Sequence, residues 1–479
     1  MAYHATARST NQELLGDYTL PDTAVSVLSP AQKIFVDYFR CPASHARFET
    51  AADLSPVEGY FTCGGAMAYG RVRGGSVAAL PATDRVPAAP AVVADAGRLE
   101  LPFDLAAVVT NLREERYRQA PGGLVERLTS ARAIQDAYYF LRPLLPVAVR
   151  RHLQRIRLGS WQSIAFPGWP VDFSVDALMR HTVGALLRAG GTRRLPFIWF
   201  WPEGASSCAV MTHDVEGPAG QAFCSELMDV DESFGIKAAF QVVPEERGTT
   251  WTELVNHLQE RGFEVNLHDL NHDGYLFRDK SQFLQRAQLI NLYARELGCR
   301  GFRSGAMYRE QRWFDAFEFA YDMSVPNAAH LEPQRGGCCT VMPYFIGKIL
   351  ELPLTTTQDY TLFHILGDYS IAMWRAQIDL IRSMNGFISF IAHPDYLIDR
   401  RARAVYAALL AHLARLRDHE GVWMALPGEV DQWWRDRSRM TMIPHGDSWK
   451  IQGPGSDRAT LAYATLDGDR VVYSVDARS

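Results

Sequence analysis

The chain has 479 residues, of which 47% are hydrophobic and 22% charged, and its formal net charge is -5 at pH 7. This composition is typical of a globular protein and excludes a disordered chain, a small disulfide scaffold and a collagen-like fibre. With 49 basic and 54 acidic residues, no basic excess points to a nucleic-acid partner. At about 100–200 residues per domain, we expect roughly two to four domains.

Cysteine usage and the absence of long apolar runs bear on the compartment. The seven cysteines include the adjacent pair Cys338-Cys339 but no CxxC pair, which argues against a zinc ribbon and favours a reducing compartment. The first 20 residues lack the apolar core of a secretory signal, and no apolar run approaches the ~18–20 residues of a membrane helix. We therefore expect a cytoplasmic protein without stable membrane insertion.

The first part of the chain divides into two predicted regions. Residues 1–100 alternate short apolar stretches with Gly and Pro and predict a β-rich region. Within it, residues 81–90 are rich in Pro and Ala and resemble a linker or surface loop. Residues 101–194 form a mostly helical region with apolar and Arg residues at three-to-four spacing, interrupted by prolines. We expect its aromatic side chains to pack against a neighbouring element: Tyr117, Tyr138, Tyr139, Trp161 and Trp169.

From residue 195 onward, short apolar runs alternate with amphipathic helical windows. The predicted strands are 208–212, 237–243, 263–267, 300–303, 320–325, 349–353, 387–392 and 422–425. One predicted helix has Trp251, Leu254, Val255 and Leu258 on one face and ends at Gly262. Others cover 283–297, which ends at Gly298, and about 369–384 and 400–419. This alternation predicts a parallel, barrel-like α/β domain over residues 195–438, with a small β appendage over residues 439–479.

Reactive side chains follow several of these strands. Asp214 and Glu216 follow the first strand, His268 the third, Arg303 the fourth and His393 the seventh. In a parallel α/β barrel all these positions open onto the carboxyl-terminal face, where such folds keep their active sites. We therefore expect these residues to lie together.

The segment from His268 to His272 suggests metal binding. We expect two histidines four residues apart to lie on one face of a helical turn, so that both imidazoles reach one ion. A carboxylate from Asp214-Val215-Glu216 would add a third ligand and leave positions for water and substrate. Two histidines and one carboxylate form the ligand pattern of catalytic zinc hydrolases.

Each residue also has an ordinary structural interpretation. Asp214 alone could cap a helix, Arg303 could form a salt bridge at the barrel rim, and His393 could be a strand-end histidine with satisfied hydrogen bonds. Asp322 could hold a backbone turn or orient His393, and we favour the turn. His330 and His364 are expected not to be ligands. Only the joint occurrence of the reactive residues favours function.

Over about residues 197–434 the sequence resembles the polysaccharide deacetylase family, whose members share the NodB homology domain. Five short segments carry the resemblance in family order: 212–216, the pair His268 and His272, 302–309, 321–324 and 390–394. The resemblance implies an α/β fold of the irregular (β/α) barrel type, in agreement with the alternation of strands and helices.

The resemblance also implies roles. Asp214 would be the general base, Arg303 would pair with Asp214 and orient it, and His393 would protonate the leaving amine. The metal, most simply Zn²⁺, would be held by three side chains: Glu216, His268 and His272. The chemistry explains these residue types, because a bound divalent ion lowers the pKa of water and polarises a carbonyl, and His titrates in the useful range.

The sequence departs from the family pattern at three places. Many members carry two adjacent aspartates where this chain has Asp214-Val215-Glu216, and the longer Glu216 shifts the carboxylate by about a bond length. His213 stands where an aromatic is commoner and could itself approach the metal. Gly305 replaces a frequent proline.

The resemblance implies a metal-dependent hydrolase that removes acetyl groups from an N-acetylated sugar, with an acetylated saccharide as its partner and no nucleic acid. Two alternatives remain open. The same site could hydrolyse O-acetyl esters or cyclic amides, or the barrel could bind a glycan without turnover.

Overall fold

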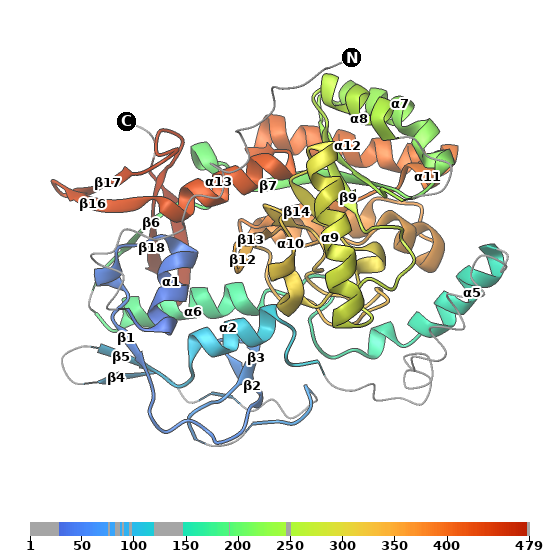
Figure 1. Ribbon diagram of the computed structural model, residues 1–479. Helices are drawn as coiled ribbons and strands as arrows, with labels where there is room; N and C mark the ends of the chain where they lie inside the picture. Colours follow the sequence, from blue (N-terminus) through green and yellow to red (C-terminus); the bar gives the residue numbers. More distant parts are fainter. Residues whose placement is uncertain are drawn as a thin grey trace, which may run out of the picture.

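The computed structural model describes residues 28–74, 77–81, 87–88, 91–94, 98–118, 147–190, 192–245 and 251–476. At its centre lies a curled, mostly parallel sheet that is surrounded by helices (Figure 1). The strands of this sheet are β7 (Ser207–Val215), β8 (Ala238–Val242), β9 (Glu264–His268), β10 (Gly301–Arg303), β11 (Tyr321–Asp322), β12 (Tyr344–Ile346), β13 (Ile349–Glu351), β14 (Phe387–Ile391) and β15 (Val422–Met424).

The strand order is β12-β13-β11-β10-β9-β8-β7-β14, and β15 also pairs with β7. Every pairing is parallel except that of β12 with β13. Each predicted strand from 208–212 to 422–425 overlaps one of these strands, and β12 is the strand that sequence analysis does not predict. All nine residues of β7 are buried, as expected for a central parallel strand covered on both faces.

The sheet is an incomplete barrel that side chains close. Hydrogen bonds of Thr355 and Thr356, in the segment after β13, link this segment to Phe387 and Ser389 of β14. Thr355 Oγ1 donates to the carbonyl of Phe387 at 2.9 Å and accepts from the Ser389 amide at 3.0 Å, while Thr356 Oγ1 donates to the Ser389 carbonyl at 2.7 Å. These bonds satisfy backbone groups of β14 that would otherwise be exposed at a sheet edge.

Helices pack on the outside of this sheet and share a core with it. They are α7 (Pro218–Ser233), α8 (Trp251–Glu260), α9 (Lys280–Leu297), α10 (Ala372–Ser383), α11 (Pro394–Leu397) and α12 (Arg400–Glu420). The four predicted helical windows overlap α8, α9, α10 and α12. Capping fixes the ends of α9, because the Asp279 carboxylate accepts the Gln282 amide at 2.9 Å and Gly298 adopts a left-handed conformation.

The N-terminal part combines helices with short strands. It contains α1 (Pro30–Phe39), β1 (Phe48–Thr50), β2 (Gly59–Cys63), β3 (Ala66–Gly70), β4 (Val92–Ala94), β5 (Arg98–Leu101), α2 (Leu105–Arg113), α5 (Val147–Leu158), α6 (Ser174–Arg188) and β6 (Leu195–Ile198). Tyr117 packs edge-on against Phe166, and Trp161 against Trp169, as expected for these aromatics. Tyr138 and Tyr139, and part of the predicted linker at 81–90, lie outside the described residues.

One hydrophobic cluster joins this part to the barrel. Phe39, Phe103 and Val183 share it with Cys208 of β7 and Leu350 of β13. Apolar burial of this kind is the main favourable term in folding, so the N-terminal part and the barrel stabilise each other.

The C-terminal part follows α13 (Pro427–Arg439) and consists of strands β16 (Thr441–His445), β17 (Ser448–Gln452), β18 (Leu461–Asp467) and β19 (Arg470–Val475). β16 pairs with β17, whereas β18 lies between β19 and β6. β6, at the start of the predicted range 195–438, therefore pairs with the C-terminal part and not with the barrel sheet. The boundaries drawn at 100, 194 and 438 stay predictions.

Short helical turns lie in several connections: η1 (Ala43–His45), η4 (Trp161–Ser163), η5 (Pro202–Gly204), η6 (Gly305–Met307), η7 (Gln311–Ala316) and η8 (Thr361–Leu366). Within the described ranges we find no helix that combines the length and the apolar character needed to cross a bilayer.

Candidate functional site

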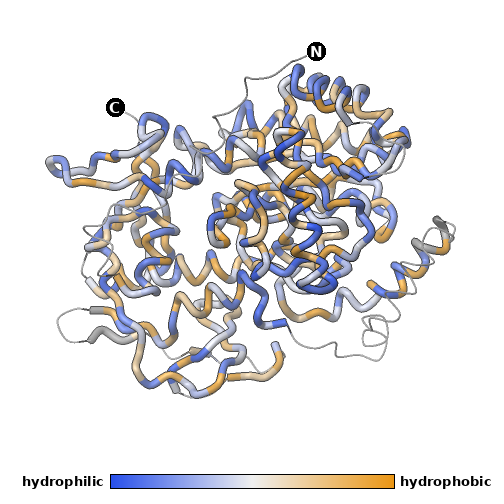
Figure 2. The backbone as a smooth tube through the Cα atoms, in the orientation of Figure 1, coloured by the Kyte–Doolittle hydropathy of each residue, from blue (hydrophilic) through white to orange (hydrophobic). Residues whose placement is uncertain are grey.

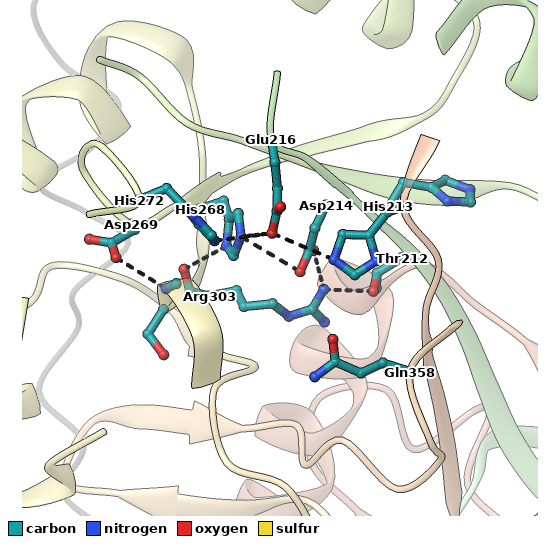
Figure 3. Close-up of polar contacts among 12 residues, drawn as sticks. Thr212, His213, Asp214, Glu216, His268, Asp269, His272, Arg303 and Gln358 are labelled. Atoms are coloured by element: carbon teal, nitrogen blue, oxygen red, sulfur yellow. Dashed lines mark hydrogen bonds and ion pairs between the residues drawn. The ribbon is translucent and has the colours of Figure 1, made fainter. Parts of the chain in front are cut away.

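The predicted site residues gather at one end of the barrel. Asp214 is the second-to-last residue of β7, and Glu216 follows that strand directly. His268 and Arg303 are the last residues of β9 and β10. His393 lies two residues beyond β14. Because these strands are parallel, their carboxyl ends meet at the same face, where Asp214, Glu216, His268 and Arg303 come together with His272 (Figure 3). His393 joins them, with Nε2 3.6 Å from Oε1 of Glu216.

Glu216, His268 and His272 form a compact group of three donors. One atom from each lies within 4.8 Å of the others. Oε1 of Glu216 is 3.0 Å from Nε2 of His272 and 3.7 Å from Nε2 of His268. Burial disfavours the charged carboxylate, but His272 and, after it, His268 and His393 hold the pKa of Glu216 well below its usual value.

The hydrogen bonds of His268 fix its tautomer. Nδ1 lies 3.2 Å from the Arg303 carbonyl, which can only accept, so Nδ1 carries a proton and the lone pair of the neutral ring lies on Nε2. That Nε2 is buried, has no hydrogen-bond partner and faces the carboxylates of Glu216 and Asp214. A buried imidazole nitrogen of this kind, beside a second histidine and a carboxylate, could hold a metal ion.

The two histidines do not lie on a helical turn, and that prediction is wrong. His268 ends β9, whereas His272 lies in the following loop, where Asp269 has a φ of 60° and His272 a φ of 52°. The Asp269 carboxylate accepts the amides of Leu270 at 2.8 Å and Gly305 at 3.2 Å, which holds this conformation. Left-handed residues bring the imidazoles together where a helix was expected.

The loop after β10 packs closely on this histidine loop. A Cβ at Gly305 would lie 2.5 Å from Oδ2 of Asp269 and 3.0 Å from Cδ2 of His272. Glycine at this position therefore permits the approach of the two loops, which explains why the chain has no larger residue there.

Asp214 and Arg303 form a buried ion pair, with Nη1 of Arg303 2.6 Å from Oδ1 of Asp214. Arg303 is 1% exposed, and it also donates to Thr212 Oγ1 at 2.8 Å and to the Met323 carbonyl at 3.2 Å. Burial opposes ionisation of Asp214, but Arg303, with His268 and His393, holds the pKa of that carboxyl below its usual value. The other carboxylate oxygen, Oδ2, lies 3.8 Å from Nε2 of His268, beside the group of Glu216, His268 and His272.

His393 is held by Asp359, a residue that sequence analysis missed. Oδ1 of Asp359 is 2.6 Å from Nδ1 of His393, and Oδ2 accepts its backbone N–H at 2.7 Å. Burial alone would lower the pKa of His393, but Asp359 and then Glu216 raise it well above its usual value. Nε2, 3.6 Å from Oε1 of Glu216, is the ring nitrogen that faces the site, and the raised pKa favours its protonated form.

Asp322 has the structural role that we favoured. Its carboxylate accepts both the backbone amide and the hydroxyl of Ser324 at 2.8 Å, which forms a turn after β11. The alternative, in which Asp322 orients His393, is wrong because Asp359 occupies that place. No spacing or motif in the sequence distinguishes Asp359 from other acidic residues.

His213 does not approach the group of Glu216, His268 and His272, so the prediction that it could approach the metal is wrong. Successive side chains of a strand point to opposite faces, so His213 points away from the face that carries Asp214. Its Nδ1 lies 3.0 Å from the Ala392 carbonyl, and its Nε2 lies 3.0 Å from Oδ2 of Asp231. The other carboxylate oxygen of Asp231, Oδ1, accepts a hydrogen bond from the Tyr406 hydroxyl. His213 is therefore part of a buried polar network behind the barrel.

No family model and no curated protein matches this sequence. Among solved structures it is similar to a protein described as a polysaccharide deacetylase from Mycobacterium smegmatis, with 16% identity, a TM-score of 0.41 and coverage of 52% of this chain and 98% of the other. Puue allantoinase matches with 14% identity and a TM-score of 0.41, covering 49% and 92%. A protein described as a polysaccharide deacetylase from Pseudomonas aeruginosa PAO1 matches with 14% identity and a TM-score of 0.39, covering 49% and 93%.

Proposed function

We propose that this protein is a metal-dependent hydrolase that removes acetyl groups from N-acetylated sugars. One observation carries the proposal: Glu216, His268 and His272 converge on one point, with the ionised Asp214 and the protonated His393 beside them. A cation site flanked by a base and an acid is the arrangement that hydrolysis of an unreactive amide requires.

Glu216, His268 and His272 would hold the ion, which we propose is Zn²⁺. When bound, a divalent ion lowers the pKa of water and polarises a carbonyl. Asp214 accepts a proton from the attacking water through Oδ2, the oxygen on the histidine side, because Arg303 binds Oδ1. Arg303 keeps Asp214 ionised and in one orientation, so this base is ready at neutral pH.

His393 supplies the acid. The leaving group of an amide is a poor one unless its nitrogen is protonated as the C–N bond breaks. Asp359 fixes the proton on Nδ1, orients the ring and favours the charged imidazolium, so Nε2 can donate a proton to the departing amine. Base and acid thus lie on different strands, at the ends of β7 and β14.

The substrate class rests on the five segments that resemble polysaccharide deacetylases, and an acetylated saccharide suits that resemblance. Ester hydrolysis and opening of a cyclic amide require the same base and the same cation site. A panel of N-acetylated oligosaccharides, O-acetylated oligosaccharides and cyclic amides separates the three, and we expect acetate release from the first.

The metal content and the acetate release of the full chain test the proposed metal site. We expect purified protein to contain about one divalent ion per chain, as three ligands predict, and a chelator to abolish acetate release until Zn²⁺ is restored. His268→Ala should lose the ion, whereas His257→Ala, at an exposed position of α8, should keep it. A protein that holds no stoichiometric ion and releases acetate in the presence of chelator would overturn the proposal.

A further inference from the structure

The loop that carries His272 has little regular structure of its own. Residues 269–275 form neither helix nor strand, and Asp269, His272 and Gly274 all have a positive φ. A left-handed conformation is costly for a residue other than glycine, so contacts from the surroundings must hold Asp269 and His272 in place. The hydrogen bonds of the Asp269 carboxylate do this for the part of the loop before His272.

A second aspartate, Asp273, holds the part of the loop after His272. Its carboxylate accepts both terminal nitrogens of Arg286, Oδ1 from Nη1 at 2.7 Å and Oδ2 from Nη2 at 2.6 Å. Oδ1 also accepts the backbone N–H of Tyr275 at 2.8 Å, which closes the turn through Gly274. Two parallel charge-assisted hydrogen bonds fix both the distance and the orientation of a carboxylate. We call this contact the Asp273–Arg286 clamp.

Arg286 stands on a firmly anchored element. It belongs to α9, an 18-residue helix whose Phe283, Ala287 and Ile290 are buried in the same hydrophobic cluster as the barrel strands. Apolar and polar positions alternate along α9 in Figure 2, as in a helix with one face on the barrel. The Arg286 side chain is 15% exposed and that of Asp273 29%, so the clamp is largely shielded from water.

The charges around Arg286 favour the clamp. Asp273 raises the pKa of Arg286 above its usual value, against the opposing effect of partial burial. The carboxylates of Asp269 and Glu245 act in the same direction as Asp273. Arg286 therefore interacts with both aspartates that flank the segment of His272.

We propose that Arg286 is a positioning residue of the candidate cation site, which acts on His272 through Asp273. The imidazole that it positions has Nε2 3.0 Å from Oε1 of Glu216, and its ring centroid is 4.9 Å from that of His268. A ligand that is already held in place loses less conformational entropy when the ion binds, so the clamp raises the affinity for the ion. This inference rests on the proposed function, because it requires an ion between these three side chains.

The Zn²⁺ affinity of the full chain, measured by competition with a chelating dye, tests the clamp. We expect Arg286→Met to bind Zn²⁺ about 10- to 100-fold more weakly than the original chain, as for other losses of support around a metal ligand. Arg286→Lys should fall between the two, because lysine keeps the charge but cannot form the fork. The matched control is Arg295→Met, also on α9, which removes an ion pair with Glu318 whose side chains are 51% and 54% exposed. It should bind Zn²⁺ normally.

A spectroscopic readout separates positioning of His272 from general support of the fold. Co²⁺ in place of Zn²⁺ absorbs visible light in a way that depends on its coordination geometry. We expect the Co²⁺ spectrum of Arg286→Met to differ from that of the original chain, while circular dichroism of the metal-free variant shows a folded protein. Should Arg286→Met fail to fold, Asp273→Asn, which keeps the size of the side chain and weakens the fork, is measured in the same way with the same expectation.

Two results would overturn this inference and leave the proposed function in place. One is an Arg286→Met variant with the Zn²⁺ affinity and the Co²⁺ spectrum of the original chain. The other is a loss of affinity that only follows a loss of folded protein, with an unchanged Co²⁺ spectrum of the fraction that stays folded. An original chain that binds neither ion would overturn the proposed function and this inference together.

Discussion

Asp359 and His393 are joined twice: Oδ1 of Asp359 lies 2.6 Å from the imidazole Nδ1, and Oδ2 accepts the backbone N–H at 2.7 Å. Asp359 precedes η8, and His393 follows β14, so the pair connects two adjacent carboxyl-terminal loops of the barrel. The double contact sets both the ring orientation and the charge of the proposed acid.

Replacing Asp359 by Asn should shift the pH dependence of acetate release. Asp359 raises the pKa of His393 well above its usual value, so the acid form is present below that raised pKa and is lost as pH rises through it. In Asp359→Asn the pKa falls, and the alkaline limb of kcat/KM should move to lower pH, with about a 10- to 100-fold loss of activity. Asp379→Asn, at an exposed position of α10, should leave the profile unchanged. An alkaline limb that stays in place would show that Asp359 does not set the acid.

Replacing Arg303 should affect the opposite limb. Arg303 helps to hold the pKa of Asp214 below its usual value, so the base is charged above that depressed pKa and is lost as pH falls through it. In Arg303→Met the pKa of Asp214 rises, and the acidic limb of kcat/KM should move to higher pH. The uncompensated buried carboxylate should also destabilise the fold by about 3–5 kcal/mol, measurable by urea unfolding.

The conservative variant Arg303→Lys separates charge from geometry. Lysine restores a positive charge but cannot reproduce the set of bonds to Thr212, Asp214 and the Met323 carbonyl. We expect the acidic limb to return toward its original position while kcat stays reduced. Full recovery of kcat would show that orientation of Asp214 by the guanidinium is unimportant.

Gly305→Ala should weaken metal binding without unfolding the protein. The added Cβ would meet the Asp269 carboxylate and the His272 ring, so the loop that carries His272 must shift. We expect metal affinity to fall about 10- to 100-fold, as for other losses of support around a ligand, when measured by competition with a chelating dye. Ser304→Ala removes a buried hydroxyl that makes no hydrogen bond, and it should bind metal normally. Equal affinity of the two variants would contradict this role of Gly305.

The N-terminal part should stabilise the site loops through one buried ion pair. Glu115 receives Arg309 Nε at 2.9 Å and the Gly337 amide at 2.6 Å, and it also pairs with Nη2 of Arg309. Glu115→Ala leaves the buried Arg309 charge without its partner, so we expect unfolding free energy to fall by about 3–5 kcal/mol.

The matched comparison is the surface pair of Glu310 and Arg312, where the Arg312 side chain is 72% exposed. Glu310→Gln should cost less than about 1 kcal/mol in the same urea titration. The double variant Glu115→Ala/Arg309→Met should be more stable than Glu115→Ala alone, because it removes the unpaired charge. If Glu115→Ala and Glu310→Gln cost the same, the buried pair does not connect the two parts of the chain.

The strands and helices of the barrel were predictable because local patterns encode them. The central strand β7 contains the apolar run Cys208–Met211, and a helix such as α9 is bounded by Asp279 and Gly298. The positions of Asp214, His268 and Arg303 at strand ends were predictable for the same reason, since parallel strands bring their carboxyl ends together. Their roles in catalysis and metal binding stay predictions.

Other features depend on contacts between residues far apart in the chain. Nothing around Asp359 distinguishes it from Asp322 until β14 is placed beside the segment after β13, and then only Asp359 reaches His393. The left-handed loop of His272 depends on Gly305 and Asp269, which pack together only in the folded barrel.

The sequence by itself determined where strands and helices form and which reactive side chains stand at strand ends, because both follow from short-range periodicity and from the parallel direction of the strands. Only the tertiary structure decided which acid holds His393, which acid meets His213 and how Glu115 reaches Arg309. Those choices are made by packing and burial, since a buried charge must find its partner wherever the chain has brought one within reach.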